Sequence, residues 1–366
     1  MRVAIVHDWL VRNVGGEKVL KAILDIYLEA DVFTLVDFLS QADRDDILNG
    51  KTTHTSFIQK LPFAKTKYTK YLPLFPYAIE QFDLRGYDLV ISTSHAVAKG
   101  VLTSSNQLHI CYCHTPMRYA WDLYFQYLEE AGLRGGIKGL LAKYFLHKIR
   151  LWDVVSSNRV DYFIANSQYI SKRIKKIYRR DSEVIYPPVN SKDFVIAPKT
   201  DDFFVCISRM APYKKVDIIV EAFSRMPERK LVVIGNGEDE AKVKAKGTDN
   251  IIFLDFQPFN SVVEYMQKAN AFIFMAEEDF GITIVEAQLC GTPVIAYGVG
   301  GASETVKDGV GGVLFSEQSA DSLIDAIRRF DNIKFNQNTI RECATRFSED
   351  IFLERFKTFV ESRYSL

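Results

Sequence analysis

The chain has 366 residues, of which 48% are hydrophobic and 25% charged, a balance that excludes a disordered or collagen-like protein. This length exceeds what one hydrophobic core usually supports, so we expect two domains. The formal net charge is zero at pH 7, but residues 1–195 hold 26 Lys and Arg against 20 Asp and Glu. The basic half indicates an anionic partner, and we expect that this partner is not a nucleic acid.

The cysteines and the apolar runs predict a cytoplasmic protein. Five cysteines are scattered along the chain, an odd number that fits reduced thiols better than a disulfide framework. The first residues read as a short strand rather than a signal peptide, and no run reaches the roughly 18 apolar residues of a membrane helix. Cys111, Cys113 and His114 supply too few ligands for structural zinc, so we expect no metal.

In the first half of the chain, short apolar runs alternate with stretches of helical periodicity. This rhythm predicts βαβ units and a parallel sheet. We expect strands at residues 3–6, 32–35, 89–92, 108–112 and 162–165, and helices at residues 17–28 and 167–178.

The second half repeats the same alternation after a break. A strand at residues 184–186 meets Pro187 and Pro188, and residues 193–202 are polar, so we place a linker there. We expect strands at residues 203–207, 230–234, 251–254, 271–275, 293–297 and 312–315, and helices at residues 216–223, 319–330 and 348–363.

These elements predict two Rossmann-like, doubly wound domains that face each other across a cleft, with the site between them. The predicted domains are residues 1–190, on the acceptor side, and residues 201–347, on the donor side. Residues 348–366 form a terminal helix whose Phe352, Phe356 and Phe359 share a face, and we expect it to pack back toward the first domain.

The most informative segment is residues 276–287, where a loop follows a buried strand and leads into a helix. The first free amides, near Gly281 to Thr283, would favour an anion such as a diphosphate. Glu278 and Glu286 lie eight residues apart and can both reach a ligand that crosses this terminus. Their carboxylates suit the vicinal hydroxyls of a sugar or ribose, although acidic residues can also simply complement a helix dipole.

A second group of candidates, Arg209 and Lys214, follows the first strand of the second domain. Arg209 can form a two-pronged contact and Lys214 a point contact with phosphate, which would stabilise a departing nucleotide. The alternative is an exposed loop with solvated charges.

In the first domain, Gly15 and Gly16 follow the opening strand, and His114 follows the strand at residues 108–112. A glycine pair permits close approach to phosphate, and a histidine at a strand end can act on a ligand. Each is weak alone, because a lone Gly-Gly or a single histidine is more often structural.

The sequence also bears on functions other than transfer of a sugar. Gly235-Asn236-Gly237 lacks a third glycine and is followed by three acidic residues, which disfavours a nicotinamide dehydrogenase. A sugar-nucleotide epimerase, a phosphorylase, a hydrolase and a non-catalytic binding module stay open. Paired carboxylates would suit hydrolysis, but the two cations would then have no use.

Several segments together resemble glycosyltransferase family 4, the retaining transferases of GT-B fold, over nearly the full length. They are the Glu278-x7-Glu286 segment with Phe280-Gly281 inside it, the run from Cys290 to Ala296, and Gly300-Gly301-Ala302-Ser303-Glu304. Three further phrases, beginning at Val6, Ser94 and Cys113, resemble bacterial mannosyltransferases of O-antigen and polysaccharide biosynthesis.

The resemblance implies the roles of individual residues. Arg209 and Lys214 would hold the diphosphate, Glu286 the ribose and Glu278 a sugar hydroxyl. Gly16, beside Gly15, would lie next to the phosphates, and His114 would contact the donor sugar. The backbone of Phe280, Gly281 and Ile282 would touch the sugar and the phosphates. Glu278, His114, Arg209 and Lys214 are the catalytic candidates.

The resemblance also implies the substrates. The donor would be GDP-mannose, the acceptor a lipid-linked oligosaccharide and the product an α-mannoside, with no metal or other cofactor; another UDP- or GDP-sugar is the alternative donor. Basic, aromatic stretches at residues 60–77 and 138–150 are candidates to rest on the anionic inner leaflet, or else are acceptor-side packing with solvated lysines.

Overall fold

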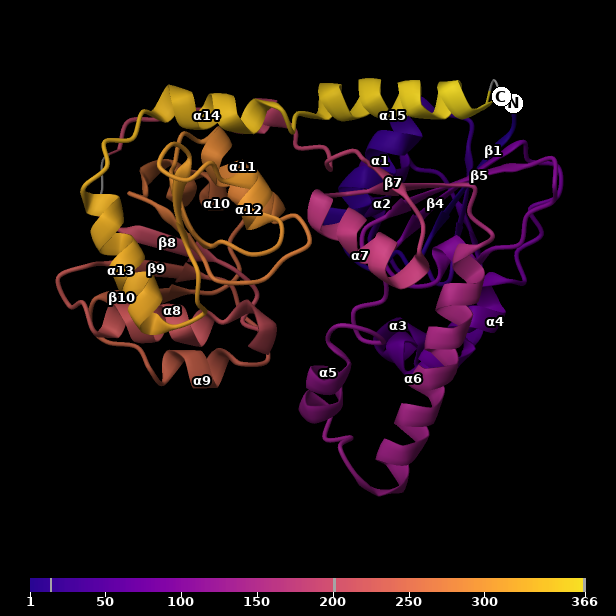
Figure 1. Cartoon of the computed structure of the whole chain (residues 1–366), viewed down its shortest axis with the longest axis horizontal. Helices are drawn as coiled ribbons and strands as arrows, with labels where there is room; N and C mark the ends of the chain where they lie inside the picture. The colour runs from indigo at the N-terminus through magenta and orange to yellow at the C-terminus, as the bar shows by residue number, and fades with distance from the viewer. Residues whose placement is uncertain (14, 200–201, 365–366) are drawn as a thin grey trace. The chain divides into compact units, whose positions relative to one another are not determined.

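The computed structural model describes residues 1–13, 15–199 and 202–364, and it divides into two compact units. Unit 1 comprises Met1–Pro188 and the chain from Phe352 onward, and unit 2 comprises Val189–Ile351. Each unit is a parallel sheet with helices on both faces (Figure 1).

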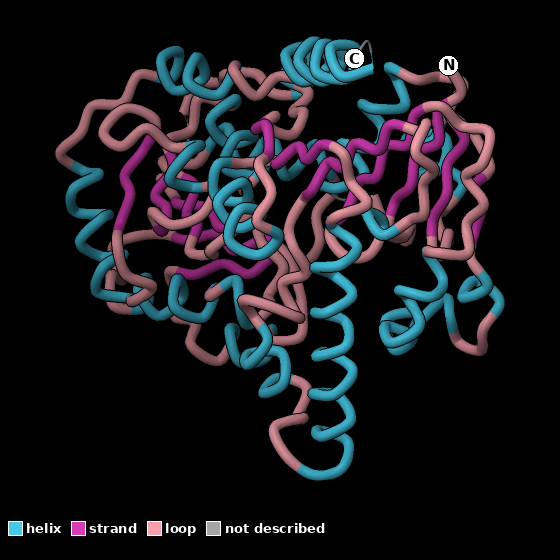
Figure 2. The backbone as a smooth tube through the Cα atoms, turned by 45° about the vertical axis from the view of Figure 1, so that its right-hand side comes forward, coloured by secondary structure: helices cyan, strands magenta, loops and turns pink. Residues whose placement is uncertain are grey.

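Unit 1 contains a seven-stranded sheet of order β3-β2-β1-β4-β5-β6-β7, in which every pairing is parallel. The strands are the magenta segments of Figure 2. Its strands are β1 Val3–His7, β2 Asp31–Thr34, β3 Thr53–Thr55, β4 Leu89–Ser94, β5 Leu108–Cys113, β6 Tyr162–Ala165 and β7 Ser182–Val184. The five strands predicted in the first half are present, and β3 is an addition. The strand predicted at residues 184–186 lies two residues earlier, at Ser182–Val184: Ile185 still donates to the Ala165 carbonyl, but Pro187 has no N–H to continue the ladder.

Alternating side chains of this sheet pack against helices on opposite faces. Ile5 and Ile91 share a core with α1 Gly15–Ile26, α2 Gln41–Leu48 and α15 Glu349–Tyr364. Ala4 and Val90 share the opposite core with α4 Phe75–Ile79 and α6 Gly136–Ser157. The remaining helices of four residues or more are α3 Ala64–Lys67, α5 Tyr124–Glu130, α7 Gln168–Tyr178 and the 3-10 segments Phe57–Lys60 and Tyr68–Leu74.

The terminal helix α15 supplies three phenylalanines to the core of unit 1. Phe352, Phe356 and Phe359 are buried there, and the Phe352 ring lies 5.9 Å from that of Tyr112 in β5. The chain thus returns to unit 1 after unit 2 is complete.

Unit 2 is a six-stranded parallel sheet of order β10-β9-β8-β11-β12-β13. Its strands are β8 Phe204–Ile207, β9 Leu231–Ile234, β10 Ile251–Leu254, β11 Phe272–Phe274, β12 Val294–Tyr297 and β13 Gly312–Phe315. Its helices are α8 Val216–Ser224, α9 Glu240–Lys244, α10 Phe259–Lys268, α11 Ile282–Leu289, α12 Ala302–Thr305, α13 Ala320–Asp331 and α14 Gln337–Thr345. The six predicted strands of this half are all present.

The predicted linker is bonded to unit 2 along most of its described part. Val189 N donates to the Phe347 carbonyl over 3.0 Å, and Lys199 Nζ donates to Ala269 O and Thr292 Oγ1, each over 2.6 Å. Burial lowers the pKa of Lys199 to about 8. As its composition predicts, the described part of this segment forms no strand or α-helix, and its bonds are made to unit 2; residues 200 and 201 of the predicted linker lie outside the described residues.

The two strand orders fix where function is expected. In both units the first strand lies beside the fourth, counting along that unit, and the chain order reverses between them. Two Rossmann-like α/β domains are therefore present, as predicted, and each has a switch point at which ligands of such sheets bind.

Candidate functional site

In unit 2 the predicted residues follow the two strands at the switch point. β8 and β11 are neighbours through Val205 and Phe272. Arg209 and Lys214 lie in the loop after β8, and Glu278 lies in the loop after β11. Because the carboxyl ends of parallel strands share one edge of the sheet, both loops emerge at that edge.

Lys214 and Glu278 form an ion pair that joins these two loops. The side chains are 19% and 18% exposed, so the pair is shielded yet accessible. Lys214 Nζ also lies 5.2 Å from the centre of the Tyr213 ring and 6.0 Å from that of Phe274, distances at which aromatic faces attract a cation. Two of the catalytic candidates thus meet at the end of β11.

Arg209 has a different partner from Lys214. Its Nη2 donates to Glu238 Oε2 over 3.0 Å and its Nε to the same oxygen over 3.2 Å. The two side chains are 60% and 49% exposed, and an exposed pair of this kind contributes about 0–1 kcal/mol. The guanidinium can therefore exchange Glu238 for a phosphate at little cost.

The loop that carries Arg209 is shaped by two glycines that sequence reasoning considered only as a cofactor motif. Gly235 has φ of +128°, and a Cβ there would lie 2.3 Å from the Ser208 carbonyl oxygen. A Cβ on Gly237 would lie 2.4 Å from the Met210 carbonyl oxygen. Both positions need glycine because two backbone segments touch, which positions Arg209 without any role as a nucleotide fingerprint.

Gly281 starts the helix that follows the β11 loop. It occupies the N-cap position of α11 with φ of +81°, and as a glycine it has no side chain to cap this terminus. Phe280 is buried beside it, with its ring 5.4 Å from Phe347. The backbone amides that begin at Ile282 are a suitable anion site.

The glycine loop at residues 300–301 braces the β11 loop from the side. Gly301 N donates to the Glu278 carbonyl over 2.7 Å. A Cβ on Gly300 would lie 2.4 Å from that same oxygen, and one on Gly301 would lie 2.2 Å from the Phe280 oxygen. These contacts fix the backbone from Glu278 to Phe280 against the glycine loop.

Glu286 is the fifth residue of α11 and is 93% buried, at 7% exposure. Because the left-handed Gly281 precedes the helix and α11 starts at Ile282, Glu286 lies one position past the first turn. A buried carboxylate is costly unless it is hydrogen-bonded or paired.

At the switch point of unit 1, Asp8 follows β1 and is completely buried. Its carboxylate accepts the backbone N–H groups of His95, Ala96, Val97 and Ala98 over 2.6 to 2.9 Å. Burial raises the pKa of Asp8, but His95 and these amides outweigh it, so that the pKa lies below its usual range. Asp8 therefore fixes the loop after β4, and sequence reasoning missed it because a lone aspartate after a strand has no distinctive spacing.

The predicted residues His114 and Gly16 lie side by side in unit 1. A Cβ on Gly16 would be 3.8 Å from His114 Nε2, and that nitrogen is buried without a hydrogen-bond partner in the described chain. Burial, followed by the nearby His95 and His7, lowers the pKa of His114 to about 3, so the ring is neutral at pH 7. Gly15, by contrast, has nothing within 4 Å of an added Cβ.

Two further residues of this cluster were not predicted. His7 Nδ1 lies 2.6 Å from Thr93 Oγ1, and His7 Nε2 lies 3.6 Å from Glu17 Oε1. Burial raises the pKa of Glu17, but His7 outweighs it and the pKa falls below its usual value. The only trace of them in the sequence is that His7 ends the strand before the Gly15-Gly16 pair and that Glu17 directly follows it.

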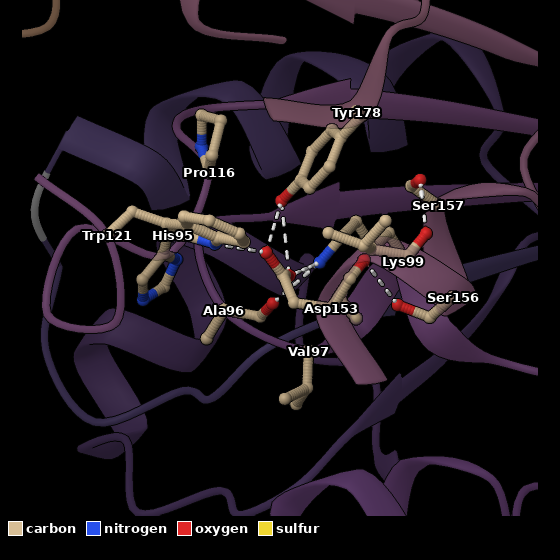
Figure 3. Close-up of polar contacts among 12 residues, drawn as sticks. His95, Ala96, Val97, Lys99, Pro116, Trp121, Asp153, Ser156, Ser157 and Tyr178 are labelled. Atoms are coloured by element: carbon tan, nitrogen blue, oxygen red, sulfur yellow. Dashed lines mark hydrogen bonds and ion pairs between the residues drawn. The ribbon is translucent and has the colours of Figure 1, made fainter. Parts of the chain in front are cut away.

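A buried ion pair ties the loop after β4 to helix α6, as Figure 3 shows. Lys99 Nζ binds the Asp153 carboxylate and also donates to Ala96 O over 3.1 Å. Trp121 Nε1 and Tyr178 Oη donate to the same carboxylate over 2.8 and 3.0 Å. Burial lowers the pKa of Lys99, but Asp153 outweighs it and the pKa is raised. The loop after β4 and helix α6 are therefore held together by buried polar contacts.

No group of three or more His, Cys, Asp and Glu side chains within residues 1–13, 15–199 and 202–364 is arranged to hold a metal ion. Two cavities at the β7 edge of unit 1, of about 250 and 370 Å³, contain none of the predicted site residues.

Comparison with protein families gives two matches that divide the chain much as the units do. Residues 30–193 match the family described as Glycosyltransferase Family 4, and residues 190–346 match Glycosyl transferases group 1.

The curated relatives are distant and are matched in part. An uncharacterised glycosyltransferase of Methanocaldococcus jannaschii is 27% identical over 61% of this chain and 62% of its own length. A GDP-mannose-dependent monoacylated alpha-(1-6)-phosphatidylinositol monomannoside mannosyltransferase of Corynebacterium glutamicum is 32% identical over 36% of this chain and 40% of its own length. The match thus spans less than two thirds of either relative.

Among solved structures, HepE of Anabaena in complex with UDP is similar in fold. It has a TM-score of 0.73 at 19% identity and covers 99% of this chain and 100% of its own. The same protein is also known in complex with UDP-glucose. Two adjoining glycosyltransferase family models thus match residues 30–346, and the chain shares the GT-B fold of HepE.

Proposed function

We propose that the protein is a retaining glycosyltransferase that moves a sugar from a nucleotide-sugar donor to a carbohydrate acceptor. The observation that carries this proposal is the Lys214–Glu278 pair at the switch point of unit 2, in the loop that leads to the glycine-capped start of α11. A cation and free amides suit the diphosphate, and the carboxylate suits a sugar hydroxyl.

For the donor we propose GDP-mannose, and for the acceptor a lipid-linked oligosaccharide of O-antigen or polysaccharide biosynthesis. The motif resemblance and the GDP-mannose-dependent relative support this choice. A UDP-sugar is the second candidate, because the similar HepE structure holds UDP and UDP-glucose.

The proposed reaction breaks the bond between the sugar C1 and the leaving phosphate oxygen and forms one from C1 to the acceptor oxygen. The acceptor enters from the face the nucleotide leaves, and its proton passes to the leaving phosphate. Lys214, Arg209 and the α11 amides would take up the developing negative charge. No metal is needed in this scheme, because these groups supply the charge that a divalent ion supplies elsewhere.

The other candidate residues would bind the sugar and the ribose of the donor. Glu278 would orient the sugar through a hydroxyl, and Glu286 would bind the ribose. The neutral His114 ring would donate a hydrogen bond to the donor sugar or accept one from it. Gly15 and Gly16 would leave room for the donor beside α1. The neutral state of His114 at pH 7 fits a hydrogen-bonding role rather than a charge.

The test is to incubate the full chain with GDP-mannose or UDP-glucose and a lipid-linked oligosaccharide, with and without a chelator. Release of free nucleotide together with an elongated glycan, unchanged by the chelator, supports the proposal. Free sugar without elongation indicates a hydrolase, an altered nucleotide-sugar an epimerase, and intact reagents a binding protein. Any of these three results would overturn it.

A further inference from the structure

Helix α6 presents an apolar face to solvent rather than to the core of unit 1. The helix runs beyond the sheet, and α5 lies beside its far end (Figure 1). Its contacts with the core come mainly from its C-terminal end, through Ile149, Asp153 and the serines that follow. Six exposed side chains recur on one side at helical spacing, and we call them the α6 apolar face: Ile137, Leu140, Leu141, Tyr144, Leu151 and Val155.

The exposure of this face is large. Ile137 is 80% exposed and Leu140 71%, and Phe125 on the neighbouring α5 is 79% exposed. Surface helices normally turn such a stripe to the core, and contiguous apolar patches usually mark an interaction site.

The segment that carries the face is basic, although Glu129 and Glu130 of α5 precede it and Glu129 pairs with Arg134. Residues 131–152 contain five lysines and arginines and no acidic residue. Lys138 and Lys148 are exposed along α6, and Lys148 Nζ lies 5.6 Å from the Tyr144 ring, within the face itself. Two copies of so basic a surface would repel each other, whereas an anionic surface would attract it.

We propose that the α6 apolar face, with Lys138 and Lys148, docks on an anionic lipid bilayer. The apolar side chains would enter the boundary between headgroups and acyl chains, and the lysines would remain among the lipid phosphates. The helix lies on the bilayer and does not cross it: none of the described helices is long and apolar enough to span a membrane.

The position of this surface links it to the site of unit 1. Asp153 at the base of α6 binds Lys99, and the loop that carries Lys99 is held by Asp8. Docking of α6 would thus fix the orientation of unit 1 to the lipid surface. That this delivers a lipid-linked acceptor rests on the proposed function, whereas the docking itself does not.

The experiment is flotation of the full chain with vesicles of phosphatidylcholine alone or mixed with phosphatidylglycerol, without donor or acceptor. We expect binding to the mixed vesicles that weakens with salt. Lys138→Gln with Lys148→Gln should weaken it about 25-fold, or about fivefold for each lysine. Leu140→Ser with Leu141→Ser should weaken it at least about tenfold at any salt concentration, because apolar burial is not screened.

Matched controls separate this surface from others of the same character. Lys242→Gln with Lys244→Gln removes two exposed lysines of unit 2, and Phe256→Ser removes a side chain of unit 2 that is 78% exposed. Both should bind like the unaltered chain, and all variants should keep its unfolding temperature.

Three results would overturn the proposal. They are absence of binding to the mixed vesicles, equal binding by the α6 variants, and a change of oligomeric mass in those variants, which would make the face a subunit interface. Since no sugar transfer is measured, failure here is distinct from failure of the proposed function.

Discussion

At the scale of single residues, the account depends most on Lys214. Its ammonium is held by Glu278 and by the rings of Tyr213, after β8, and Phe274, at the end of β11, where the leaving diphosphate is proposed to sit. Lys214→Ala should lower kcat by about 10²–10³-fold, as for loss of one oxyanion donor, and weaken donor binding only about tenfold. Initial rates over a range of donor concentrations measure both.

The matched control is Lys244→Ala, since Lys244 also pairs with a glutamate in unit 2, at an exposed position. It should leave both constants unchanged. A Lys214→Ala enzyme with unaltered kcat would show that the lysine has no part in catalysis.

His114 makes the stability of unit 1 sensitive to acid. Its pKa is about 3 in the folded chain and 6.5 ordinarily, so the unfolded chain binds more protons between these values. Its contribution is complete above pH 6.5 and is lost as the pH falls toward about 3. In thermal unfolding from pH 7 to pH 4, His114→Gln should therefore lose stability less steeply than the unaltered chain; equal slopes would refute the neutral buried ring.

The sequence predicted where the candidate residues lie in the fold better than it predicted their contacts. Arg209, Lys214 and Glu278 lie in loops at strand ends, and such loops can be found from periodicity alone. The pairing of Arg209 with Glu238 depends on the β9 loop, which no local pattern connects to β8. The role of Asp8 was missed for the same reason, because the four amides that it accepts from lie 87 to 90 residues further along the chain.

At the scale of elements, the glycine loop at residues 300–301 is expected to set the β11 loop. Gly301 has no positive φ, so Gly301→Ala acts only through the Cβ that would meet the Phe280 oxygen. We expect about 1–3 kcal/mol of destabilisation and weaker donor binding. Gly15→Ala is the control, because space is open there and alanine favours a helix; urea unfolding of both variants is the measurement. Equal stability of the two variants would contradict the close contact.

The buried Lys99–Asp153 pair should hold the β4 loop and α6 together. Asp153→Asn leaves the Lys99 ammonium without its countercharge and should cost about 3–5 kcal/mol in urea unfolding. The double variant Lys99→Met with Asp153→Leu should recover only part of that loss, because it removes the unpaired ammonium but leaves Trp121 Nε1 and Tyr178 Oη without their acceptor. If the double variant were as unstable as the single one, the unpaired ammonium would not be the source of the loss.

Elements with one buried stripe were predicted well, and elements without one were not. Helix α7 has a capping Ser167 and a clear apolar stripe, and the prediction of residues 167–178 is confirmed by Gln168–Tyr178. Helix α6 is 22 residues long but was not predicted as a helix, because its apolar residues face solvent as well as the core. Strand β3 is only three residues long and none of them is buried, so it carries little periodic signal.

At the scale of the whole molecule, the repeated βαβ rhythm sufficed to predict two parallel-sheet domains. The rhythm could not predict the strand orders or the two switch points, because the order depends on the edge of the sheet to which each crossover connection returns. The return of α15 to unit 1 could be anticipated from its three phenylalanines, since a helix with such a stripe needs a core to cover it.

The central claim is that Arg209 and Lys214 of unit 2 together bind the diphosphate of the donor. The most direct measurement is calorimetric titration of GDP and of UDP into the full chain, the Arg209→Ala/Lys214→Ala double variant and the Lys244→Ala control. We predict that one of the nucleotides binds, that the control binds it equally, and that the double variant binds it about 100-fold more weakly, or about tenfold for each charged contact. Binding of neither nucleotide by the unaltered chain, or equal binding by the double variant, would contradict the account.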